Sequence, residues 1–112
     1  MGGSISVVSA TDLVLNLDAD CPGPAQLRVR GGSPNGRAAI GFSFAEGSDP
    51  VSAGTCTGTP TALSSPKLLT FLALDGNGAA TLDATLPAGA CGVFVQVVDP
   101  ATCATSNTAQ AP

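Results

Sequence analysis

Four cysteines are the residues of this sequence with the clearest chemistry, and no histidine accompanies them. They lie in turn-like contexts at Cys21, Cys56, Cys91 and Cys103. An even number of cysteines in a small, turn-rich chain indicates two disulfides and an oxidising compartment. The alternative is a zinc site made from all four thiolates. Zinc sites usually contain close Cys-x-x-Cys pairs, whereas the shortest interval here is the twelve positions from Cys91 to Cys103, so we expect disulfides.

Four cysteines permit three pairings, and the strand expected over residues 92–98 excludes one of them. An extended segment of that length separates Cys91 from Cys103 by more than about 20 Å, while the Cα atoms of a disulfide lie within about 7 Å. The alternating direction of successive strands places Cys21 and Cys91 at the same end of the domain. We therefore expect Cys21–Cys91 and Cys56–Cys103, the second pair depending on the path of a long loop.

Eight acidic residues are the second group of candidate functional residues. Calcium binds six to eight oxygen atoms, several of them from carboxylates of one loop. No segment matches an EF-hand or an Asp-rich calcium repeat, and strand-end or turn roles account for most of these side chains. The calcium candidates are Asp18, Asp20, Glu46, Asp49, Asp75 and Asn77. We expect no metal and no other cofactor, with calcium as the alternative.

The residue types that are missing exclude most catalytic sites. Without histidine there is no Ser-His or Cys-His pair, and there is no Gly-x-Ser-x-Gly motif, so we expect no catalytic residues and no enzyme. Four basic residues and a net charge of −4 do not provide the positive surface that nucleic acid requires. No apolar run is long enough to insert into a membrane. The expected partners are neighbouring protein domains or further copies of the chain, with glycan as the alternative.

The elements that must position these residues are strands. Fourteen glycines and nine prolines interrupt short apolar runs, which is typical of an all-β protein. No window holds the helical repeat of apolar positions. Strong turn sequences occur at residues 33–36 and 75–78. The predicted strands cover residues 12–18, 26–30, 37–45, 67–74, 79–86, 92–98 and 104–109.

This spacing predicts an all-β, immunoglobulin-like Greek-key sandwich of seven to eight antiparallel strands with two disulfides. Residues 11–112 form its single domain. Residues 1–10 combine an artificial leader, Met1-Gly2-Gly3-Ser4, with a β-prone run over Ser4–Ala10 that is a candidate N-terminal strand.

Alternation along the strands predicts the core and the outward faces. All four phenylalanines, Phe42, Phe44, Phe71 and Phe94, are interpreted as core residues rather than as a sugar-stacking surface. Arg28 and Arg30 share an outward face and are expected to pair with Asp83 or another acid across the sheet. The predicted core comprises Leu27, Val29, Ile40, Phe42, Leu72, Leu82, Val95 and Val97.

An ordered string of motifs covers about Leu13 to Thr108: Cys21-Pro22-Gly23, Gly32-Ser33-Pro34-Asn35-Gly36, Cys56-Thr57-Gly58, Leu74-Asp75-Gly76-Asn77-Gly78-Ala79-Ala80, Ala90-Cys91-Gly92, Val95-Gln96-Val97-Val98-Asp99 and Cys103-Ala104-Thr105-Ser106-Asn107. This order resembles an immunoglobulin-like β-sandwich module of secreted proteins from myxobacteria, planctomycetes and related bacteria. The resemblance implies an extracellular location. The module has no established activity, so the resemblance implies no site residues.

The leading functional expectation is a secreted or cell-surface bacterial module with a structural or adhesive role. The first alternative is a calcium- or glycan-binding module that uses the loops near Cys21, Glu46–Asp49 and Ala88–Gly92. The second alternative is a self-assembling subunit of an extracellular filament, in which Ser4–Ala10 adds as a strand to the open sheet edge of a neighbour.

Overall fold

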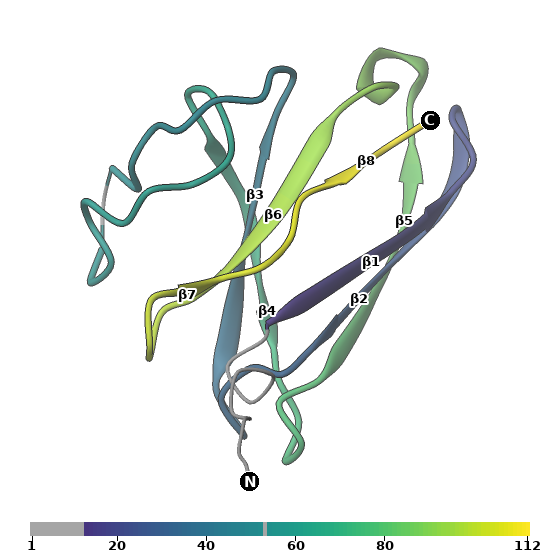
Figure 1. Ribbon diagram of the computed structural model, residues 1–112. Coiled ribbons are helices and arrows are strands. Elements are labelled where there is room, and N and C mark those ends of the chain that lie inside the picture. The colour runs from purple at the N-terminus through teal and green to yellow at the C-terminus, as the bar shows by residue number, and fades with distance from the viewer. Residues whose placement is uncertain (1–12, 53) are drawn as a thin grey trace, which may run out of the picture.

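The computed structural model describes residues 13–52 and 54–112, which form two antiparallel sheets (Figure 1). Sheet A has the order β1-β2-β5 and contains β1 (Val14–Ala19), β2 (Gly23–Arg30) and β5 (Ala80–Leu86). Sheet B has the order β4-β3-β6-β7 and contains β3 (Arg37–Ser43), β4 (Lys67–Ala73), β6 (Phe94–Asp99) and β7 (Ala104–Thr105). Strand β8 (Ala109–Gln110) also pairs with β6, and a short 3-10 turn, η2 (Ala88–Ala90), precedes β6. The leader and the candidate strand Ser4–Ala10 lie outside the described residues.

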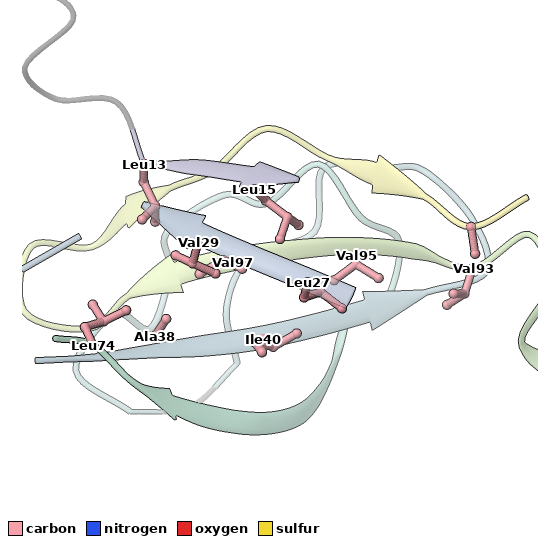
Figure 2. Close-up of a cluster of buried hydrophobic side chains, with 11 residues drawn as sticks. Leu13, Leu15, Leu27, Val29, Ala38, Ile40, Leu74, Val93, Val95 and Val97 are labelled. Carbon is pink, nitrogen blue, oxygen red and sulfur yellow. The ribbon is translucent and has the colours of Figure 1, made fainter. Parts of the chain in front are cut away.

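The core lies between the two sheets, because alternate side chains of each strand point to the same face. Leu15 and Val29 of sheet A point toward Val97 and Ile40 of sheet B (Figure 2). All four side chains are at most 2% exposed. The other buried members of this cluster are Leu13, Leu27, Ala38, Leu74, Val93, Val95 and Ala111. The molecule is therefore an all-β protein of sandwich type, as predicted.

The predicted core is confirmed for five of its eight residues, namely Leu27, Val29, Ile40, Val95 and Val97. The remaining three, Phe42, Leu72 and Leu82, pack against the core but are only partly buried. Leu72 and Leu82 lie on the edge strands β4 and β5, and Phe42 lies one residue before the end of β3. At these places a large side chain reaches the apolar cluster without being covered by it.

The prediction that every phenylalanine is a core residue holds only for Phe42, which packs against the core. Phe94 alternates with the core residues Val93 and Val95, so it points to the outer face of sheet B. Phe44 is 60% exposed and Phe71 is 44% exposed. Phe44 follows the last residue of β3, where the chain leaves the sheet. Phe71 pairs with Ala39, and Ala39 alternates with the core residues Ala38 and Ile40, so Phe71 points to the outer face of sheet B.

The strand predicted over residues 104–109 is divided into β7 and β8. Between them, hydrogen bonds of side chains replace part of the backbone ladder. The Ser106 hydroxyl accepts a hydrogen bond from Val97 N at 2.9 Å. The Asn107 amide brackets Leu15 of β1: Leu15 N donates to Oδ1 at 2.8 Å, and Nδ2 donates to Leu15 O at 2.9 Å. Side-chain groups that bind backbone in this way compete with the regular ladder. Here they join sheet B to the edge of sheet A.

A buried carboxylate fastens the turns at one end of sheet B. Asp99, at the end of β6, is 2% exposed. Its Oδ2 accepts hydrogen bonds from the backbone N and the hydroxyl of Ser33, both at 2.8 Å, and its Oδ1 accepts one from Ala101 N at 3.0 Å. Buried polar groups need such partners. Asp99 therefore ties the β2–β3 turn to the β6–β7 turn.

Candidate functional site

The two disulfides have the predicted pairing. Cys21 and Cys91 lie 5.5 Å apart between Cα atoms, and Cys56 and Cys103 lie 5.4 Å apart. The first bond joins the β1–β2 turn to the segment between η2 and β6, and the second joins the β3–β4 loop to the β6–β7 turn. With all four cysteines paired, no thiolate is left for the zinc alternative.

The six calcium candidates are dispersed over the molecule. Asp75 and Asn77 form a turn, in which Asp75 Oδ1 accepts hydrogen bonds from Asn77 N at 2.8 Å and Ala79 N at 3.0 Å. Asp49 Oδ2 accepts one from Ser65 N at 2.6 Å. Within residues 13–52 and 54–112, no three His, Cys, Asp or Glu side chains form a group that could hold a metal ion. The remaining candidates, Asp18, Asp20 and Glu46, are exposed.

The loops proposed for calcium or glycan are brought together only in part. The Cys21–Cys91 disulfide places the β1–β2 turn beside the η2 region, which contains Ala88–Gly92. The β3–β4 loop, which contains Glu46–Asp49, begins at the same end, since Ser43 pairs with Phe94, but it then runs away from the η2 region, to the left in Figure 1.

The outward face of sheet A carries a hydrogen-bonded row of polar side chains. Arg28 Nε donates to Gln26 Oε1 at 2.8 Å, and Gln26 Nε2 donates to Asp83 Oδ1 at 3.0 Å. The predicted pairing of Arg28 with Asp83 therefore takes place through Gln26 rather than by direct contact. Gln26 is directly opposite Asp83 in the register of β2 and β5, which explains why it stands between them.

The β3–β4 loop, residues 44–66, folds back on itself as an irregular hairpin. Gly47 N donates to Ala62 O at 3.1 Å, and Val51 N donates to Thr59 O at 2.9 Å. The loop is fastened to the outer face of sheet B at Gln96, a β6 residue that is 5% exposed. Gln96 Oε1 accepts from Ala62 N at 2.8 Å. The hydrogen bond from the Ser43 hydroxyl to Ser64 O and the Cys56–Cys103 disulfide are two further attachments.

A hollow of about 340 Å³ lies on the outer face of sheet B, between this loop and β4. We call it the sheet B groove. Its lining includes the small residues Ala39 and Gly41 of β3 and Val98 of β6. The β4 residues Leu68 and Phe71 line it as well, and the loop contributes Val51, Leu63 and Pro66. The groove is therefore lined mainly by apolar side chains.

Two cations belong to this apolar groove. Arg37 and Lys67 both line it, and the Arg37 guanidinium carbon lies 4.4 Å from the centre of the Phe71 ring. Such stacking of a cation on an aromatic ring is attractive and fixes the orientation of the guanidinium. Among the described residues that line the groove there is no carboxylate. The arrangement can hold an apolar group and a negative charge at the same time.

Sequence reasoning did not identify the sheet B groove. The outward residues Ala39 and Gly41 of β3 are small, and this was a readable signal that the face could be approached closely. The path of the β3–β4 loop, which supplies the opposite wall, has no comparable signal.

Within the described part of the chain, no helix has the length and apolar character needed to cross a bilayer. Comparison with protein-family models, with curated proteins and with solved structures found no match for this chain.

Proposed function

We propose that the chain is a non-enzymatic extracellular module with a structural or adhesive role in a secreted or cell-surface bacterial protein. The observation that carries the proposal is the pair of disulfides, which join residues 70 and 47 positions apart in the sequence. Closing loops of this size stabilises a small domain by about 4 kcal/mol each in the chain-entropy treatment. Such bonds persist in oxidising compartments and are rare in the cytosol.

We further propose that the connectivity is the immunoglobulin-like Greek key. The chain crosses between sheets from β2 to β3, from β4 to β5 and from β5 to β6, and β5 lies beside β2. Crossings in this order support a Greek-key arrangement of the two sheets. The resemblance to secreted immunoglobulin-like modules supports the same topology.

Protease resistance tests the structural role. The oxidised protein, the fully reduced protein and a Cys21→Ala/Cys91→Ala variant are digested with proteinase K, and the half-life of each is measured. The proposal predicts that the oxidised protein survives at least about tenfold longer than the reduced one, because the disulfides lower the population of open chain. Equal half-lives, or reduced cysteines in protein taken from its natural source, would show that the proposal is wrong.

A second candidate function is self-assembly by strand addition, and the free edge of sheet B favours it. Strand β4 is the edge strand of that sheet. It exposes Leu68, Leu69 and Phe71 by 58%, 55% and 44%. An apolar edge strand with unpaired backbone groups is a template for a further strand. The proposed donor is the Ser4–Ala10 segment of a second copy.

Light scattering coupled to size exclusion, with negative-stain imaging of each peak, tests this candidate. The full chain is compared with a chain lacking residues 1–10, with Leu69→Lys on the β4 edge, and with Asn16→Lys, which adds the same charge at an exposed site of β1. Assembly predicts polymers for the full chain and for Asn16→Lys, and monomers for the other two. A monomeric full chain refutes the candidate, and a polymer that survives the deletion refutes the assigned donor.

A further inference from the structure

We propose that the sheet B groove binds a small apolar molecule that carries one carboxylate. In this assignment the apolar body lies against Leu68, Phe71 and the small residues of β3, and the carboxylate is held by Arg37, whose guanidinium lies over the Phe71 ring. This site goes beyond the structural and adhesive role, and neither proposal depends on the other.

The size of the hollow selects a small molecule rather than a length of peptide. Its volume of about 340 Å³ is at the lower end of the range of roughly 300–1,000 Å³ that is typical of small-molecule sites. The hollow is therefore of the size that a small molecule occupies. A medium-chain carboxylic acid such as decanoate has this size.

The charges of the groove select an anion. The chain has eight acidic and four basic residues. Two of the basic residues line the groove, and no carboxylate does so among the residues described there. The groove is thus a positive, apolar site on an acidic protein. Because a guanidinium presents several donors in a rigid plane, Arg37 can bind a carboxylate through two parallel hydrogen bonds.

The groove is held open by the attachments of its walls. The β3–β4 loop is fastened to β6 by the hydrogen bond between Ala62 N and Gln96 Oε1, and to the β6–β7 turn by the Cys56–Cys103 disulfide. On the opposite wall, Arg37 is stacked on the ring of Phe71. A site that keeps its shape when empty loses little conformational entropy on binding. This favours the binding of a ligand in the groove.

Nuclear magnetic resonance of the full, oxidised chain tests the proposal, with decanoate as the probe and decyltrimethylammonium as a cation of the same chain length. Both are used below the concentrations at which they form micelles. Decanoate is expected to shift the amide signals of Ala39, Gly41, Leu68 and Phe71 in a saturable manner. The cation is expected to bind at least about tenfold more weakly, because the groove carries no carboxylate to pair with it.

Three variants locate the site. Arg37→Gln is expected to weaken decanoate binding about tenfold, as the loss of a charged hydrogen-bonding partner does. Arg28→Gln makes the same change of charge on the outward face of sheet A and is expected to leave the affinity unchanged. Gly41→Leu is expected to abolish binding by filling the groove. A Cβ at Gly41 meets only Lys67 O at 3.6 Å and Gln96 O at 3.7 Å, so the backbone accepts the change.

A loss of decanoate binding can be distinguished from misfolding, because the amide spectrum of each variant reports whether the sheets are intact. Equal binding of the anion and the cation, or equal effects of Arg37→Gln and Arg28→Gln, overturns the proposal. Shifts confined to sheet A overturn it as well. Tighter binding of an end-blocked Val-Leu-Asp-Val peptide than of decanoate would identify the groove as a peptide site instead, and would also overturn it.

Discussion

The two sides of the sandwich are built differently. On one side, β1 of sheet A lies against β8 of sheet B, and the Asn107 amide binds both the N–H and the C=O of Leu15. On the other side, β4 and β5 lie beside each other as the edge strands of their sheets, and β4 exposes most of its apolar side chains. The first side uses polar side chains to complete the fold, whereas the second leaves apolar surface uncovered.

The covalent bonds reinforce this contrast. Cys91 and Cys103 lie before and after β6, the strand that carries β3, β7 and β8 in its pairings. Neither disulfide has a cysteine in β4 or next to it. Stability is thus concentrated around β6 and the β1–β8 side, while the β4 side is where a partner strand or a ligand is expected. Substitutions on the two sides should therefore have different consequences.

Removal of the Cys21–Cys91 disulfide should have the largest effect on folding. Replacing both cysteines with alanine is expected to lower the free energy of unfolding by about 4 kcal/mol, because the unfolded chain regains the freedom of a long loop. Urea denaturation followed by circular dichroism measures the loss. A loss below about 1 kcal/mol would show that the ladder and the core hold this end of the sandwich without the bond.

Truncation of the Asn107 side chain should have the next largest effect. Asn107→Ala leaves the N–H and C=O of Leu15 without their partners and is expected to cost about 2 kcal/mol. Asn16→Ala removes an exposed amide from the same β1 strand and is the matched control, expected to cost less than about 0.5 kcal/mol. Similar costs for the two variants would show that the hydrogen bonds of Asn107 to Leu15 do not stabilise the β1–β8 side of the sandwich.

The smallest expected effect is the difference in local stability between β6, an inner strand of sheet B, and β4, an edge strand of the same sheet. Paired amides of β4 should exchange their hydrogens at least about tenfold faster than those of β6, because β4 is an exposed edge strand with few buried side chains. Native-state hydrogen exchange read by nuclear magnetic resonance measures both strands in one sample. Equal protection of β4 and β6 would remove the contrast between the two sides.

Much of the fold was predictable because it follows from alternation and from loop closure. The period-two pattern placed Leu27 and Val29 in the core, and the length of the strand between Cys91 and Cys103 excluded their pairing. These inferences need only the geometry of a strand. The turn at residues 75–78 followed from its own residue types, and in the structure Asp75 binds its backbone as such turns do.

Other features depend on contacts between distant segments, which no local pattern encodes. No local pattern at Ser106 and Asn107 indicates a contact with β1, and only the approach of β1 explains the role of the Asn107 amide. Phe71 reads as a core residue because the run around it is apolar, yet β4 is an edge strand and its outer face is uncovered. The sheet B groove was missed for the same reason, since its second wall is a loop whose path is set by Gln96 and Cys103.

Tension applied to the two ends of the oxidised chain would load only part of it, because the Cys21–Cys91 bond transmits force directly between those residues. The stretch 22–90 stays outside the load path even after both sheets have separated. At roughly 3.3–3.6 Å for each extended residue, the oxidised chain can lengthen to only about two-fifths of the span that the reduced chain reaches. A tether made of such domains is short when its cystines are intact, and reduction more than doubles its reach.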